Sequence, residues 1–129
     1  MKVLVVEDDR SIQMVLELVL TRMAKCSVVA ASDGPEGLAK IQTEKPDIVL
    51  LDLMLPGMDG FEICQRVKAD EATRLIPIIF LTAQPQPSFV ARAMALGAAG
   101  YLVKPFDPVK IIDQINEALT RVQAPTIAK

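Results

Sequence analysis

Polar residues that could do chemistry follow directly after each of the five short apolar runs of this chain, with Ser32 and Asp33 after the run 28–31. Glu7 and Asp8 follow the run 3–6, Asp52 the run 48–51, Thr82 the run 78–81, and Lys104 the run 101–103. If the runs are parallel strands of one sheet, their carboxyl ends meet at one edge, and ligands bind there in open α/β sheets. Three carboxylates, a hydroxyl and an ammonium group would then share one site.

The acidic residues of this set point to a metal ion. Glu7 and Asp8 would lie beside Asp52, and each pair of like charges at about 4 Å costs on the order of 4 kcal/mol at an effective dielectric of about 20. A hard divalent cation would offset that repulsion, and a few carboxylates, a carbonyl and water suit Mg²⁺, or Mn²⁺ in its place. The alternative for any one acid is a helix N-terminal charge, which we expect for Asp9.

Asp52 could act as a nucleophile toward phosphorus and form an aspartyl-phosphate. The alternative is a helix cap, but Asp59 in the following turn already provides one. Lys104 could contribute a positive charge to a phosphate, and Thr82 could donate its hydroxyl to the same oxygens. Taken alone, Lys104 could be an ordinary solvated lysine and Thr82 an ordinary β-branched strand residue. Only their combination with the acidic residues indicates a site. The chain has no histidine, which excludes Ser-His-Asp catalysis and a phosphohistidine on this chain.

Composition limits the class of protein. A chain of 129 residues with 51% hydrophobic residues can bury the core of one domain, with both faces of a sheet covered. The net charge of −2 and the lack of a basic stripe give no case for direct nucleic-acid binding. No run is long enough to span a membrane, and no secretory signal is visible, so we expect a cytoplasmic protein. Cys26 and Cys64 are expected to be reduced structural thiols.

The apolar runs alternate with segments of helical periodicity. The helical positions are Ile12, Val15, Leu16, Val19 and Met23, then Leu38 and Ile41, Ile63 and Val67, Val90, Ala93, Met94 and Gly97, and finally Ile112, Ile115, Leu119 and Val122. Because the runs do not themselves alternate with polar residues, they suit strands buried on both faces. This order predicts an α/β fold with a parallel sheet and right-handed crossovers.

Capping residues mark where the helices begin and end. Asp59 with Glu62 is typical of a capping box, Gly34-Pro35 and Asp107-Pro108 of helix starts, and Gly97 of a helix end. We expect one domain over residues 1–122. Residues 123–129 are expected to be a flexible tail or a linker stub.

With these positions assembled, the chain resembles a response regulator receiver domain of bacterial two-component systems, of the CheY-like kind. The resemblance covers residues 2–122. The matching segments are Val5–Asp9, Asp47–Gly60, Ile79–Ala83 and Gly97–Phe106, and their order and spacing are highly specific. The resemblance implies a flavodoxin-like (βα)5 doubly wound sheet of five parallel strands in the order 2-1-3-4-5.

The resemblance also implies roles for individual residues. Asp52 would be the phosphoryl acceptor, and Glu7, Asp8, Asp52 and the backbone carbonyl of Met54 would hold Mg²⁺. Thr82 and Lys104 would contact the phosphoryl oxygens. Tyr101 would be the aromatic switch residue that turns inward when Thr82 moves toward the phosphate. The Lys104–Pro105 bond is a candidate for a cis peptide.

Two departures from the family pattern lead to expectations of their own. Pro85 and Pro87 lower the conformational entropy of the loop after Thr82, so we expect a stiffer switch or a later start of the next helix. Met54 and Gln84 stand where the family tunes hydrolysis of the aspartyl-phosphate. Because the Met54 side chain cannot hydrogen-bond an attacking water, we expect a long-lived phosphate.

The function expected from the resemblance is a phosphorylation-dependent switch in a phosphorelay, which catalyses only its own phosphorylation and dephosphorylation. Its partners would be a sensor histidine kinase or histidine phosphotransfer protein, a downstream effector, or a second copy bound through the fourth and fifth helices. Ile12 and the loop Pro105-Phe106 would meet the kinase, although Ile12 could equally be a core residue. The alternatives are a degenerate receiver acting as a binding module, or an aspartyl-phosphate phosphatase, which would need an acid at Met54.

Overall fold

The five apolar runs form five parallel strands in the computed structural model, which describes residues 1–127. The strands are β1 Lys2–Val6, β2 Ser27–Ala31, β3 Ile48–Asp52, β4 Ile78–Thr82 and β5 Gly100–Val103. Their order in the sheet is β2-β1-β3-β4-β5, and every neighbouring pair is parallel. The flavodoxin-like fold expected from the sequence is therefore confirmed.

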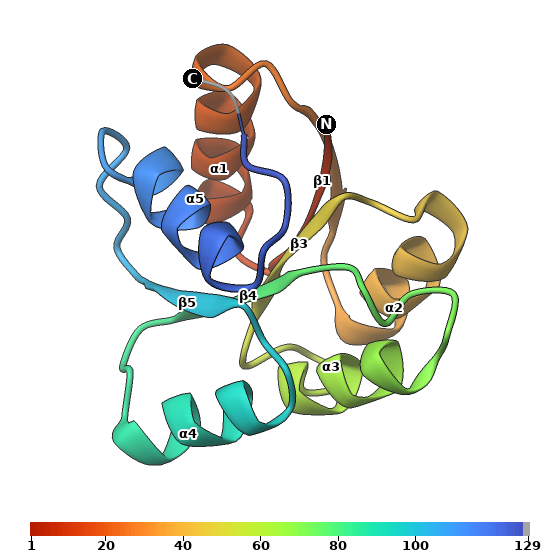
Figure 1. Ribbon diagram of the computed structural model, residues 1–129. Coiled ribbons are helices and arrows are strands. Elements are labelled where there is room, and N and C mark those ends of the chain that lie inside the picture. The colour runs from red at the N-terminus through yellow and green to blue at the C-terminus, as the bar shows by residue number, and fades with distance from the viewer. Residues whose placement is uncertain (128–129) are drawn as a thin grey trace.

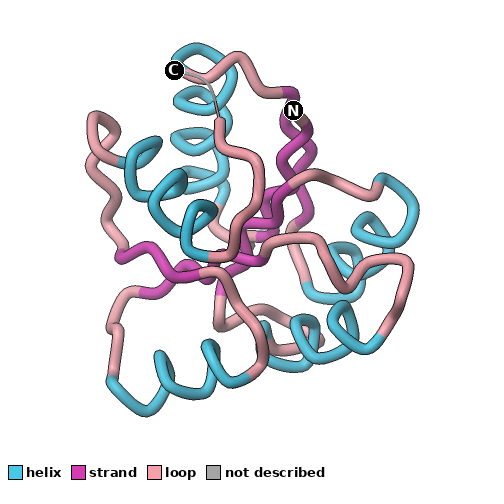
Figure 2. The backbone as a smooth tube through the Cα atoms, viewed as in Figure 1, coloured by secondary structure: helices cyan, strands magenta, loops and turns pink. Residues whose placement is uncertain are grey.

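One helix follows each strand, as the periodicity predicted. The helices are α1 Arg10–Met23, α2 Gly34–Glu44, α3 Gly60–Ala69, α4 Pro87–Ala95 and α5 Ile111–Arg121. Figure 1 shows α1 and α5 together on one side of the sheet and α2, α3 and α4 on the other. The sheet therefore lies between two helical layers, which Figure 2 shows as a magenta band between cyan coils.

The central strands β1, β3 and β4 are buried on both faces, which explains why they are almost continuously apolar, whereas the edge strands β2 and β5 keep exposed residues. All five residues of β3 are buried. One core cluster packs α1 and α5 against residues such as Val5 and Leu50, and a second packs α2 and α3 against Leu4 and Leu51. Cys26 and Cys64 are free and buried, as expected. None of the helices among residues 1–127 has the length and apolar character that crossing a bilayer requires.

The helix starts were largely predicted. Asp33 caps α2 and Asp59 caps α3 through their carboxylates, and Gly97 follows α4 with a φ of 92°. The α5 start differs, because the helix begins at Ile111 rather than at Pro108. Asp107 instead accepts a hydrogen bond from Val109 N–H, and its carbonyl accepts from Ile111 N–H, so the first turn is a separate tight turn.

The inner face of α1 also differs from the predicted one. Gln13, Leu16, Val19 and Leu20 are buried, whereas Val15 and Met23 are exposed. The apolar residues of α1 cover more than one face of the helix, so their spacing alone does not fix which side faces the sheet. Gln13 takes the buried place at the end of the helix nearest the strand ends.

The segment after α5 turns back along the helix. Ile127 is 4% exposed, and its backbone N–H and carbonyl are both hydrogen-bonded by the side chain of Asn116, at 2.7 and 2.9 Å. A tail was expected over residues 123–129, of which 128 and 129 lie outside the described residues. The described part packs against the core that contains α1 and α5.

Candidate functional site

The strand register brings the acidic residues together. Val6 pairs with Leu51 across β1 and β3, so the next residues along each strand, Glu7 and Asp52, are neighbours at the carboxyl edge. Oxygens of Glu7, Asp8 and Asp52 lie within 4.8 Å of one another. Glu7 is fully buried and Asp52 is 6% exposed, whereas Asp8 faces solvent. The three groups form an acidic cluster (Glu7, Asp8, Asp52) that is open on one side.

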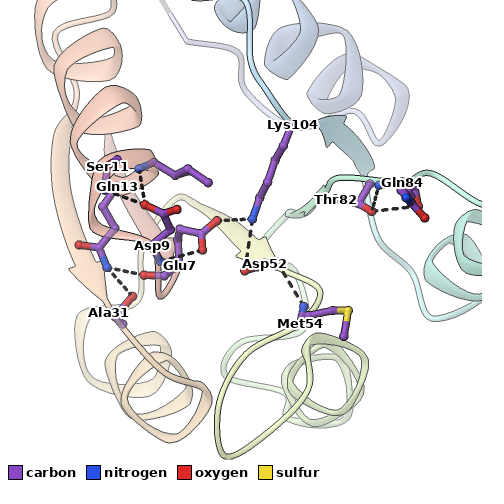
Figure 3. Close-up of polar contacts among 11 residues, drawn as sticks. Glu7, Asp9, Ser11, Gln13, Ala31, Asp52, Met54, Thr82, Gln84 and Lys104 are labelled. Carbon is purple, nitrogen blue, oxygen red and sulfur yellow. Dashed lines mark hydrogen bonds and ion pairs between the residues drawn. The ribbon is translucent and has the colours of Figure 1, made fainter.

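Lys104 extends from the end of β5 into this cluster, as Figure 3 shows. Its Nζ lies 2.5 Å from Glu7 Oε1 and 3.3 Å from Asp52 Oδ2. Burial alone would lower the pKa of Lys104, but the hydrogen bond to Glu7 and the charge of Asp52 outweigh it and raise the pKa above its ordinary value. Lys104 therefore stays charged, and the Lys104–Pro105 bond at its base is cis, as predicted.

Glu7 is the most perturbed acid of the cluster. Burial raises its pKa to about 7, although the ion pair with Lys104 and the Asp9 N–H lower it; the neighbouring Asp52 raises it further. Asp9 N–H donates to Glu7 Oε2 at 3.1 Å, while the Asp9 carboxylate accepts from Ser11 and Ile12 N–H and caps α1. Asp9 is thus the helix cap that the sequence indicated.

Asp52 is held by the backbone on its α3 side. Met54 N–H donates to Asp52 Oδ1 at 3.2 Å, and the Met54 side chain is 78% exposed. A Cβ on Gly60 would lie 2.7 Å from the Asp52 carbonyl oxygen, so only glycine lets α3 begin this close. One carboxylate oxygen of Asp52 accepts the Met54 N–H, and the other pairs with Lys104 Nζ. The carboxylate therefore lies within reach of Glu7 and Asp8, the other members of the acidic cluster.

Thr82 ends β4, next to the end of β3 that carries Asp52, and Tyr101 lies on the neighbouring strand β5. The Thr82 hydroxyl accepts from Gln84 N–H and donates to Gln84 carbonyl, both at 3.2 Å, on the side away from Asp52 in Figure 3. Tyr101 is 40% exposed on β5. Phe89 and Pro85 line a narrow apolar cavity between these two residues. Ile12 and Phe106 are half-buried against the core that contains α1 and α5.

The prediction from sequence missed Gln13. This side chain is 4% exposed and donates to backbone carbonyls of Glu7 and Ala31 and to Ser32 Oγ. Its signal in the sequence was its place three residues before Leu16 and seven before Leu20, on the buried stripe of α1. The role of a single glutamine among apolar residues cannot be predicted from sequence, because it depends on the groups that the side chain contacts.

A family model for the response regulator receiver domain matches residues 3–116. Among curated proteins, the alkaline phosphatase synthesis transcriptional regulatory protein PhoP of Bacillus subtilis is 39% identical over 93% of this chain and 49% of its own length. The DNA-binding response regulator MtrA of Mycolicibacterium paratuberculosis is 37% identical over 93% of this chain and 52% of its own length. The chain therefore spans about half the length of these curated relatives.

Solved structures match the chain over almost their whole length. The chemotaxis protein CheY4 of Vibrio cholerae has a TM-score of 0.82 at 36% identity, covering 94% of this chain and 97% of that one. A putative response regulator from Chloroflexus aurantiacus has a TM-score of 0.84 at 38% identity, covering 92% and 97%. Both structures therefore resemble this chain in sequence as well as in fold.

Proposed function

The chain belongs to the response regulator receiver domain family of two-component signalling, and on that basis we propose that Asp52 accepts a phosphoryl group and so switches the domain. The phosphoryl donor would be a phosphohistidine of a sensor kinase or of a histidine phosphotransfer protein. The convergence of Glu7, Asp8, Asp52 and Lys104 on one edge of the sheet carries this proposal.

The acidic cluster fits a divalent cation. It combines three carboxylates in close reach with a single ammonium group, Lys104, so negative charge is left over. These are hard oxygen donors, which suit Mg²⁺ or Mn²⁺. Glu7, Asp8, Asp52 and the Met54 carbonyl would hold the ion. Once bound, it would neutralise charge on the transferring phosphoryl group.

The residues of the chain would then perform the transfer as follows. A carboxylate oxygen of Asp52 forms a bond to phosphorus as the bond from phosphorus to the donor imidazole nitrogen breaks. That nitrogen keeps the electron pair and becomes protonated. Lys104 already lies 3.3 Å from Asp52 Oδ2 and would stay beside the new phosphoryl oxygens, with Thr82 as a second donor. Self-phosphorylation on this scheme needs no group beyond the chain, the ion and the donor.

The switch would act through Thr82 and Tyr101. To reach a phosphoryl oxygen, the Thr82 hydroxyl has to leave its two hydrogen bonds with Gln84. The half-exposed Tyr101 ring would move toward the space that Thr82 leaves, beside the apolar cavity at Phe89. Phosphorylation would thereby shift an equilibrium between two arrangements of the α4–β5–α5 face.

The partner surfaces follow from this scheme. Ile12 and the loop Pro105-Phe106 would meet the donor protein. The α4–α5 face would meet an effector or a second copy of the chain. Direct binding of nucleic acid by this domain is not proposed, and a cytoplasmic location stays a prediction. The receiver domain is proposed to span residues 1–122, with 123–129 as tail or linker.

Two alternatives are less well supported. A phosphatase that works through an aspartyl intermediate needs an acid two residues after the nucleophile, and Met54 stands there with an exposed thioether side chain. A binding module without chemistry would have no need to bury Glu7 and Asp52 side by side, an arrangement with a clear electrostatic cost.

Incubation with acetyl phosphate and Mg²⁺, followed by the intact mass of the protein, distinguishes these functions. The switch predicts the stable addition of one phosphoryl group, which is absent without the metal and absent in Asp52→Ala. Continuous release of phosphate with turnover would instead support the phosphatase. An unchanged mass would support the binding module. Asp33→Ala, a helix cap on the neighbouring loop, is a matched control that should still be phosphorylated.

A further inference from the structure

The buried side chain of Gln13 joins two loops at the acidic edge of the sheet, although it is not itself a candidate ligand. We infer that Gln13 is a positioning residue, which fixes the Glu7–Asp8 peptide and so sets the affinity of the acidic cluster for Mg²⁺. This inference rests on the proposed function and identifies a determinant of the same site. Gln13 lies in the first turn of α1, on the side facing the strand ends.

The contacts of Gln13 Nε2 show what it holds. This amide group donates to the carbonyl of Glu7, and it lies 3.3 Å from the carbonyl of Ala31 and 3.2 Å from Ser32 Oγ. The two backbone carbonyls fix which end of the amide faces them, because the amide oxygen could not hydrogen-bond to either carbonyl. Figure 3 shows the amide between the β1 end and Ala31.

The hydrogen bond to the Glu7 carbonyl acts on the ligand geometry. That carbonyl belongs to the peptide that links Glu7 to Asp8, two of the three residues of the acidic cluster. With the carbonyl anchored to a rigid helix, the peptide plane is fixed, and with it the direction in which Asp8 leaves the chain. Glu7 N–H is fixed as well, because it donates to the Ala31 carbonyl at 3.0 Å.

The contact with Ser32 joins Gln13 to a turn that packs on the loop after Asp52. Ser32 begins the turn between β2 and α2, where Gly34 N–H donates to the Pro56 carbonyl at 3.1 Å. A Cβ on Gly34 would lie 2.5 Å from the Met58 carbonyl oxygen, so this turn packs directly on the loop that follows Asp52 and Met54. The β2–α2 turn contributes no carboxylate to the acidic cluster, yet it contacts Gln13 through Ser32 and the loop after Asp52 through Gly34.

Removal of the Gln13 amide should therefore weaken metal binding rather than only the fold. Outer residues that orient metal ligands typically contribute a factor of about 10 to 100 in metal affinity. Gln13→Met keeps the length of the side chain and removes both N–H donors. We expect its Mg²⁺ dissociation constant, measured by titration calorimetry, to rise about tenfold.

The control is Val19→Ala, which removes buried volume from the same helix far from the acidic edge. It should destabilise the fold while leaving the Mg²⁺ dissociation constant within about twofold of wild type. A second measurement separates positioning from general damage: half-maximal phosphorylation by acetyl phosphate should need about tenfold more Mg²⁺ in Gln13→Met than in wild type, and no more in Val19→Ala. An unchanged dissociation constant in Gln13→Met would overturn the inference.

If Gln13→Met does not fold, the wild-type protein decides the question by nuclear magnetic resonance. The side-chain amide signals of Gln13 should shift during a Mg²⁺ titration with the same midpoint as the backbone amide of Asp8, and signals that stay fixed would overturn the inference. A wild-type protein that binds no Mg²⁺ and takes up no phosphoryl group would refute the proposed function, and the inference with it. Normal uptake by the wild type, together with a Mg²⁺ dissociation constant of Gln13→Met equal to that of wild type, refutes the inference alone.

Discussion

At the scale of single residues, Glu7 gives the acidic cluster a measurable dependence on pH. Burial raises its pKa from 4.5 to about 7 in the folded chain. Between these pH values the unfolded chain has lost a proton that the folded chain still holds. The contribution of Glu7 to the free energy of unfolding therefore falls as the pH rises through this window, by up to about 3 kcal/mol.

Glu7→Gln tests this dependence, because glutamine resembles the protonated acid. Without divalent ions, the variant should be more stable than wild type above pH 7, and the difference should vanish near pH 4.5. Denaturant unfolding across that range measures it. Glu17→Gln on the exposed face of α1 is the control and should show no such trend. A higher free energy of unfolding for wild type than for Glu7→Gln at pH 8 would contradict the proposed effect of burial on Glu7.

Met54 offers a test of phosphoryl lifetime. Its exposed thioether cannot orient a water molecule for attack on an aspartyl-phosphate, so we expect slow dephosphorylation. Met54→Asn supplies a hydrogen-bonding group at the same place and should shorten the half-life about tenfold. Loss of the phosphoryl mass over time, after removal of acetyl phosphate, measures this. A lifetime that is equal or longer in Met54→Asn would show that the position does not control hydrolysis.

Whether the role of a single residue could be predicted from sequence depended on its position relative to the strands. Glu7, Asp52 and Lys104 were recognisable because each ends an apolar strand, and parallel strands bring their ends together. Gln13 was not, because its role depends on the carbonyl of Glu7, just after β1, and on that of Ala31, at the end of β2. Hydrogen bonds to backbone leave no mark on the type of the partner residue.

At the scale of elements, the loop between β4 and α4 is where the switch would have to move. Pro87 occupies the first turn of α4, and Gln86 before it makes no side-chain cap. We expect Pro85 and Pro87 to restrict the loop that carries the Thr82–Gln84 hydrogen bonds. Amide hydrogen exchange should be slower in residues 83–90 of wild type than in the double variant Pro85→Ser, Pro87→Ser.

The loop 54–58, which has its own proline at Pro56, serves as an internal reference and should exchange alike in both proteins. If residues 83–90 of wild type exchange as fast as the first residues of the chain, the prolines do not stiffen the switch.

The elements themselves were predictable to different degrees. Strands were placed nearly to the residue, because a buried parallel strand must be apolar throughout. The face of α1 was placed wrongly at Val15 and Met23, since apolar residues on several sides leave the rotation of the helix undetermined. The start of α5 was placed a turn early, because Asp107 closes a separate turn that has the same sequence signature as a helix cap.

At the scale of the whole molecule, the acidic cluster should reduce stability until a cation binds. Asp8 is exposed, so the repulsion it adds is screened, and Asp8→Asn should raise the free energy of unfolding without Mg²⁺ by about 1 kcal/mol. Mg²⁺ should then raise the melting temperature of wild type, because a ligand that binds only the folded state stabilises it.

The same ion should have little effect on Asp8→Asn, and Glu117→Gln on the exposed face of α5 should behave like wild type. Thermal melts with and without Mg²⁺ measure both effects. A wild type that melts at the same temperature in millimolar Mg²⁺ as in chelator would mean that the acidic cluster does not bind the ion.

The central claim is that Asp52, among all the nucleophiles of the chain, receives the phosphoryl group. Treatment of the phosphorylated protein with borohydride reduces an aspartyl-phosphate to homoserine, and peptide mass spectrometry then locates the modified residue. Homoserine is expected at position 52 only, and only in samples that contained Mg²⁺. Modification at any other position, or uptake that does not depend on the metal, would contradict it.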